Sequence, residues 1–337
     1  MSRLNPIWTA GRLNEALARA QGDVHLDLGP DGHIATIAYP TSSRGLQGQS
    51  AETRRRFQGS AFVHPITEAG HFDEGLRQLP PLLAFLAINP EPWCRTVVNP
   101  GALESVGPFF DYTNPLWEWL VRAARAGRAH LFPLRESFAY FGSARQEYPL
   151  DNSAIPLPDL VRSDQTGAPA WLRATLDDFE LGRVYPNVKS TPDATAVAAG
   201  LLEMHDLVGS HELAQSIEGR GGHQAGDYWH AIHHRREPDP SNAKYWFRQV
   251  GAHPVHERLA MATRAFFSLA QASDQATELD KSLHRLAPKG VWDPFAFVDF
   301  CGQAVAEKDL PLVRAARQLQ FLEMTWLLES AYEDATT

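Results

Sequence analysis

The chain is poor in cysteine and has no long apolar run. Its 337 residues include two cysteines, Cys94 and Cys301, and neither belongs to a CxxC pair. We therefore expect two buried free thiols in a reducing compartment. The longest apolar stretch, residues 79–88, is too short to cross a bilayer and contains two prolines. The N-terminus lacks the apolar segment of a signal peptide, so a cytoplasmic protein is expected.

The sequence also lacks an excess of positive charge and the common nucleotide-binding motifs. Its formal net charge of −9 argues against nucleic acid as a partner and against binding to an anionic membrane surface. No glycine-rich dinucleotide fingerprint, P-loop or G-x-S-x-G nucleophile motif is present. These absences favour hydrolase or lyase chemistry on a small polar molecule and leave the reaction type open.

The patterns that are present predict an α+β protein that is predominantly α. The chain is long for one core, so we expect two parts. An α+β region with β-hairpins is predicted over residues 1–150, and an α-helical domain over residues 169–337. Residues 151–168 are rich in Pro, Ser and Asp without periodicity, which is typical of a connector.

The strand signals lie in the N-terminal region. Alternating apolar residues at 24–28 and 34–39 flank a Pro-Asp-Gly turn and predict a β-hairpin. Residues 128–142 predict a second strand–turn–strand, and residues 95–99 predict a buried strand. Helices are predicted at 11–21, 74–88 and 115–126.

Beyond the connector, apolar spacing predicts helices almost exclusively. Capping residues predict where several of them start, at Thr191-Pro192, Ser210, Ser241 and Asp293-Pro294. Long amphipathic helices are predicted at 254–272, 275–286, 293–307 and 310–333.

Residues 216–247 concentrate the reactive side chains of the chain. This stretch holds four histidines behind a glycine-rich lead-in, and it predicts a helix from about Asp227 to Arg236 that Pro238 and Pro240 end. Asp227 is expected to cap the first turn. Four side chains share one stripe about 80° wide on the helix surface: Asp227, His230, His234 and Glu237.

This stripe predicts a catalytic site or a metal site. The i,i+4 spacing of His230 and His234 allows both imidazoles to reach one metal ion, although Ala231 stands where an HExxH motif has its glutamate. In a metal-free alternative, one imidazole acts as general acid or base, held in one tautomer by a neighbouring carboxylate. The same pattern is also typical of an ordinary polar helix face whose histidines hydrogen-bond to their neighbours.

The predicted site residues fall into three classes. The predicted catalytic residues are Asp227, His230, His234 and Glu237. The predicted substrate-binding residues are Trp229, Arg235, Arg236, Asn242, Lys244 and Tyr245. The predicted metal ligands are His230 and His234, with His205 or His223 adding a ligand from a neighbouring helix or loop. The metal would be divalent Zn, Fe or Mn, and the cofactor is otherwise open.

One long segment of the chain carries a resemblance. The run GDYWHAIHHRREPDPSNAKYWFRQVGAHP, with the later Trp-Asp-Pro-Phe at 292–295, resembles a family of uncharacterised bacterial and fungal proteins. Those proteins carry a similar D-Y-W-H-A-I-x-H-R-R-E and N-A-K-Y-W-F-R pattern. The resemblance covers roughly residues 195–330 and implies no mechanism, because that family has no established activity.

Two functions of different class fit the sequence. The first is an enzyme, with the imidazoles facing a small polar substrate under Trp229, Tyr245 and Trp246, and with arginine or lysine binding a carboxylate or phosphate. The second is a non-catalytic ligand-binding or interaction protein, in which the aromatic pairs lie on an exposed patch and the helical half forms a homodimer. Exposure of Trp229 and Trp246 distinguishes the two.

Overall fold

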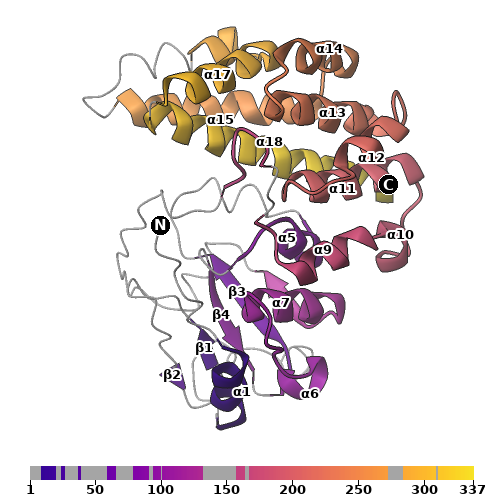
Figure 1. The fold of residues 1–337 in the computed structure, drawn as a ribbon, viewed down its shortest axis with the longest axis vertical. Helices are drawn as coiled ribbons and strands as arrows, with labels where there is room; N and C mark the ends of the chain where they lie inside the picture. The colour runs from indigo at the N-terminus through magenta and orange to yellow at the C-terminus, as the bar shows by residue number, and fades with distance from the viewer. Residues whose placement is uncertain are drawn as a thin grey trace. The chain divides into compact units, whose positions relative to one another are not determined.

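The computed structural model describes residues 9–19, 24–26, 37–38, 59–65, 79–90, 94–99, 101–131, 157–163, 167–271, 284–308 and 310–337. These residues are predominantly helical, as predicted. They fall into two compact units (Figure 1). One contains α1, the five strands and α5 to α7, and the other contains α10 to α18. Helix α9 (Ala170–Asp177) spans the boundary between them.

The first unit is built on a five-stranded sheet of order β2-β1-β4-β3-β5. Its pairings are antiparallel except for β3 with β5, which is parallel. The strands are β1 (Val24–Leu26), β2 (Ile37–Ala38), β3 (Ala61–Pro65), β4 (Cys94–Val98) and β5 (Ala129–Leu131). The helices are α1 (Ala10–Arg19), α5 (Pro81–Ala87), α6 (Ala102–Val106) and α7 (Pro115–Arg125).

Buried tryptophans join the helices of this unit. The indole of Trp117 on α7 donates to the carbonyl of Phe85 on α5 at 2.6 Å. Trp119 donates to the carbonyl of Gly107 at 2.9 Å, just beyond α6. An indole buried with its N–H satisfied adds apolar area without an unpaired donor. The helix predicted at 115–126 and the strand predicted at 95–99 are thus confirmed as α7 and β4.

The predicted β-hairpins are not established by the described residues. Strands β1 and β2 pair antiparallel, but the predicted turn and most of both arms lie outside the described residues. In the second predicted hairpin only β5 is described, and it pairs with β3, while the predicted turn and return strand lie outside the described residues. The helix predicted at 74–88 is described from Pro81 only.

The second unit is a helical assembly, and its longest described helix is α18 (Leu310–Thr336). Helix α18 packs against α11, α15, α17 and α13. The other helices are α10 (Leu181–Val184), α11 (Thr191–Glu203), α12 (Ser210–Ser216), η2 (Gly222–Gln224), α13 (Ala225–Arg236), α14 (Pro240–Val250), α15 (Pro254–Gln271), η3 (Pro288–Gly290) and α17 (Pro294–Glu307). Most of the helix predicted at 275–286 lies outside the described residues.

Helix α13 is surrounded by neighbours. It packs against α14, α11, α12 and α18, and all twelve of its residues are buried. Its close approach to α11 requires Gly200, because a Cβ there would lie 2.4 Å from the Trp229 ring. The predicted helix is confirmed, but it has no exposed polar face.

Four predicted helix caps are wrong, and the first is Thr191, because Ser190 caps α11 by accepting from the Asp193 N–H. Gln224, not Asp227, precedes α13, and the Asp227 carboxylate accepts from Gly219 N–H at 3.2 Å. Helix α12 follows Gly209, while the Ser210 hydroxyl donates to the Ala199 carbonyl. Helix α14 is capped by the aspartate before Pro240, two residues before the predicted Ser241. By contrast, Asp293 caps α17 as predicted, accepting from two backbone N–H groups.

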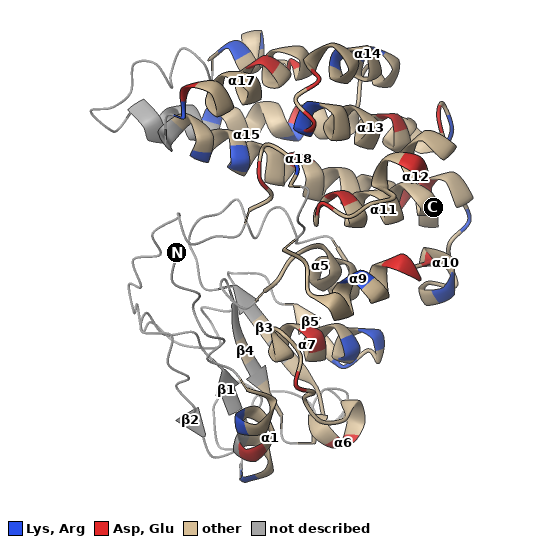
Figure 2. Ribbon diagram, in the orientation of Figure 1, with Lys and Arg blue, Asp and Glu red and all other residues tan. Residues whose placement is uncertain are grey.

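Charges of both signs are interspersed along the helices of the second unit, with most of each ribbon uncharged (Figure 2). Among the described residues, no helix combines the length and hydropathy needed to cross a bilayer.

Candidate metal centre

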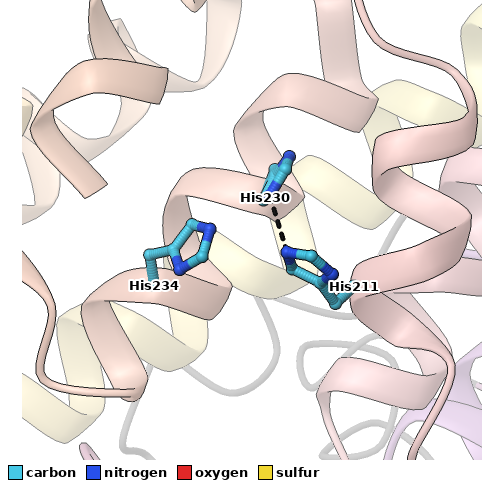
Figure 3. A group of neighbouring side chains, drawn as sticks. All are labelled: His211, His230 and His234. Atoms are coloured by element: carbon cyan, nitrogen blue, oxygen red, sulfur yellow. Dashed lines mark hydrogen bonds between the residues drawn. The ribbon is translucent and has the colours of Figure 1, made fainter. Parts of the chain in front are cut away.

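Three imidazoles meet where α12 packs on α13. His211 is the second residue of α12, and His230 and His234 lie one turn apart on α13 (Figure 3). One ligand nitrogen from each lies within 4.8 Å of the other two. The closest pair is His230 Nε2 and His211 Nε2, at 2.9 Å. We call these residues the three-histidine group.

Ring stacking holds the group in place. The indole of Trp246 on α14 stacks on His230 with ring centroids 4.0 Å apart. His230 in turn stacks on His234 at 4.8 Å, and His211 meets both rings edge-on. His230 and His234 are buried, whereas His211 is half-buried. Solvent therefore reaches the group at His211 and at the exposed Glu237 beside His234.

Burial keeps the two α13 imidazoles neutral. Desolvation lowers the pKa of His230 to about 3, and the neighbouring imidazoles His211, His234 and His233 add to this effect. The pKa of His234 is lowered as well, chiefly by burial, although Glu237 opposes the shift. Neutral imidazoles offer the lone pairs that a metal ion requires.

A carboxylate fixes the tautomer of His234. Glu237 Oε2 lies 3.1 Å from His234 Nδ1. A carboxylate only accepts, so the ring proton lies on Nδ1 and the lone pair on Nε2. That lone pair accepts from the side-chain amide of Asn242 at 3.1 Å. A carboxylate behind an imidazole in this way is the usual support of a metal-binding histidine.

One nitrogen of the group is unpaired. His230 Nδ1 is buried without a hydrogen-bond partner. It is not the nitrogen that meets the other imidazoles, because His230 contacts His211 through Nε2 (Figure 3). The donor set fits a metal ion that accepts imidazole ligands, such as zinc or iron.

A second cluster lies beside the three-histidine group on α13, where the His233 and His211 rings are 5.0 Å apart. Glu203 at the end of α11 contacts His233 Nδ1 at 2.9 Å, Arg236 Nη1 at 2.6 Å, and Arg162. Arg236 also binds Asp206 at 2.6 Å. We call these five residues, Glu203, His233, Arg236, Arg162 and Asp206, the Glu203 cluster.

In the Glu203 cluster the buried carboxylate is balanced by the positive charges around it. Burial alone would raise the pKa of Glu203, but Arg236, the hydrogen bond with His233 and Arg162 outweigh it and lower the pKa to about 2. Glu237 links this cluster to the three-histidine group, because it contacts His233 Nε2 at 3.0 Å and His234 Nδ1 at 3.1 Å. Glu237 thus supports two adjacent imidazoles.

Several predicted site residues lie elsewhere. Asp227 contacts the loop at Gly219 and contributes no ligand atom to the group. Trp229 is fully buried against α11, and Arg236 belongs to the Glu203 cluster. Arg235 is buried, pairs with Glu323 at 2.5 Å and lies over the Phe297 ring.

The remaining predicted ligands and contacts are also separate from the group. His223 is exposed and pairs with Asp334 at 2.8 Å, and His205 is not among the converging ligands. Lys244 pairs with Asp299 at 2.6 Å. Tyr245 is exposed and meets Trp246 edge-on. Only His230, His234, Glu237 and Asn242 of the predicted residues are joined by contacts at the centre.

Sequence reasoning missed His211, His233 and Glu203. His211 lies in a short helix 19 positions before His230, and no spacing rule connects the two. The one sequence signal for His211 is its position at the start of a predicted helix that directly precedes the glycine-rich lead-in. Comparisons of the chain with protein-family models, with curated proteins and with solved structures give no match.

Proposed function

We propose that the chain is a metal-dependent enzyme of the hydrolase or lyase type that acts on a small polar substrate. His211, His230 and His234 would hold one divalent transition metal ion. The observation that carries the proposal is the convergence of three imidazole nitrogens within 4.8 Å. Imidazole ligands favour zinc or iron over manganese, which prefers oxygen.

Three protein ligands leave a coordination position for water or substrate. A metal ion in that setting polarises a carbonyl or lowers the pKa of a bound water, which is the chemistry that hydrolases and lyases need. Glu237 has a side chain that is 45% exposed, and it contacts both His233 and His234. It is therefore suited to hold His234 in its ligating tautomer and to take up a proton at the edge of the site.

This proposal selects one of the two roles predicted from the sequence for His230 and His234. Both residues would be metal ligands rather than acid–base groups, and Glu237 keeps the supporting role. The resemblance of residues 195–330 to the bacterial and fungal family stays a proposal. The run that carries the resemblance contains His230 and His234 and begins after His211.

The burial of the tryptophans favours an enzyme over an interaction protein. An interaction surface built on the aromatic pairs would expose Trp229 and Trp246, but their exposures are 0% and 7%. Trp246 instead stacks on the His230 ring. The aromatic residues therefore support the centre rather than form a contact patch.

Metal analysis tests the proposal. The protein is purified without a chelator or a metal-affinity tag, offered zinc or ferrous iron, desalted and analysed for bound metal. We expect near one equivalent in the parent chain and a loss in His211→Ala and His230→Ala. Removing a ligand should lower affinity by more than the 10–100-fold that is typical of outer-shell partners.

His284→Ala is the matched control, because it removes an exposed histidine outside the group. It should bind metal as the parent does. Circular dichroism and a thermal melt establish that each variant is folded. His211 is the most informative ligand position, because a half-buried side chain can be truncated at low cost. If the folded parent protein binds neither zinc nor ferrous iron, the proposal is wrong.

A further inference from the structure

Asn242 contacts His234 Nε2, the nitrogen of the three-histidine group whose lone pair is fixed by the Glu237 contact at Nδ1. It belongs to the first turn of α14, where the Asp239 side chain accepts from the Asn242 backbone N–H at 3.1 Å. That cap fixes the backbone of Asn242 where α14 packs against α13. Its side-chain amide therefore reaches His234 from a rigid position.

The orientation of this amide follows from Glu237. The carboxylate at His234 Nδ1 requires a proton on that nitrogen, which leaves a lone pair on Nε2. Asn242 must then present its NH2 group, since the amide oxygen would place a second lone pair 3.1 Å away. The amide donates to the nitrogen that a metal ion would use.

We infer that Asn242 competes with the metal ion for His234 Nε2 and acts as a latch on the empty centre. The inference rests on the proposed function. In the metal-free protein the latch holds the His234 ring in its ligating orientation and satisfies its buried nitrogen. When metal binds, the amide must turn away before the third imidazole can coordinate. Asn242 is half-buried, so the amide has solvent to turn toward.

The latch has two opposite effects. It preorganises His234, because the ring is oriented by Glu237 on one side and by Asn242 on the other. It also lowers the net affinity, because one hydrogen bond is lost when the metal enters. The centre therefore exchanges metal more readily than an unlatched three-histidine site would.

Zinc titration of two neighbouring variants tests the latch. Asn242→Ala removes the competing donor, and Ser241→Ala changes the adjacent exposed residue, which has no contact with the group. The dissociation constant is measured by competition with a chromophoric zinc chelator. We expect Asn242→Ala to bind zinc about fivefold tighter than the parent, the ratio that corresponds to one neutral hydrogen bond. Ser241→Ala should match the parent.

Asn242→Asp extends the test, because a carboxylate cannot donate and adds a negative charge beside the metal. It should bind zinc more tightly than Asn242→Ala. Equal or weaker binding by Asn242→Ala would overturn the latch while leaving the metal centre intact. Failure of the parent and of all variants to bind zinc would instead overturn the proposed function, and the latch with it. Melting of the metal-free proteins establishes that each variant is folded.

Discussion

Two adjacent polar clusters on α13 are opposite in character. In the Glu203 cluster a buried carboxylate meets two guanidinium groups and an imidazole. In the three-histidine group the rings meet each other, and His230 Nδ1 has no partner. One cluster is saturated by charges of opposite sign, and in the other the imidazoles of His230 and His234, kept neutral by burial, lie close to His211.

This difference separates scaffold from site. A buried ion pair with all its hydrogen bonds made is stable only as a whole, and it has no capacity left for a ligand. Imidazoles kept neutral by burial and aimed at one another have lone pairs to offer. Arg236, a predicted substrate-binding residue, belongs to the saturated ion-pair cluster, and His230 belongs to the group of imidazoles.

The largest expected effect is the loss of stability when an ion pair of the Glu203 cluster is removed. Glu203→Gln keeps the shape of the side chain but leaves Arg236 and Arg162 without their shared anion. Removing one partner of a buried ion pair typically costs about 3–5 kcal/mol. Chemical denaturation monitored by circular dichroism measures the change in the free energy of unfolding.

Glu180→Gln provides the control for this comparison. Glu180 pairs with Arg183 on the surface, where the side chains are 60% and 72% exposed. Surface pairs of this kind contribute about 0–1 kcal/mol, so the control should unfold almost as the parent does. Similar losses in the two variants would mean that the Glu203 cluster is not the matched network that its contacts indicate.

Acid should destabilise the protein in two stages. Burial, with the neighbouring imidazoles, lowers the pKa of His253 from 6.5 to about 3, and burial lowers that of His256 from 6.5 to about 4. As the pH falls below 6.5, the unfolded chain takes up protons that the folded chain refuses, so stability is lost. Below 4.5, protonation of Glu203 in the unfolded chain adds a second loss that continues to about pH 2.

Denaturation at several pH values separates these stages. His256→Gln should flatten the dependence between pH 6.5 and 4, and Glu203→Gln should flatten it below pH 4.5. The two variants thus distinguish imidazoles that are buried without an anion from a carboxylate that is buried with cations. A parent protein whose stability does not change between pH 7 and 5 would contradict the first stage.

Helices with strong local end signals were predictable from the sequence. Asp293 followed by proline starts α17, and the prolines after Arg236 end α13, because both effects act within one turn. The Ser210 and Ser241 caps were wrong because competing groups lie next to them. Gly209 adopts the left-handed backbone before α12, and an aspartate already caps α14.

The site was only half predictable, for a physical reason. The i,i+4 spacing of His230 and His234 is a local property of one helix, and it identified two of the three histidines of the group. His211 joins them through the packing of α12 on α13, which no periodicity encodes. The helical wheel also assumed one buried and one exposed face. Because other helices surround α13, its polar side chains are buried on every side and need buried partners. Arg235 and Arg236 form such pairs, which stabilise the fold.

The smallest expected effect is at Lys244, the predicted substrate-binding lysine. Its ammonium pairs with Asp299 at 2.6 Å, and the two side chains are 27% and 66% exposed. A pair this open contributes less than about 1 kcal/mol, so Lys244→Ala should unfold close to the parent. Zinc affinity should also stay within about twofold, because Lys244 contributes no ligand to the three-histidine group. A tenfold change in zinc affinity would instead mean that the charge of Lys244 acts on the centre, and that the boundary between scaffold and site lies further along α14.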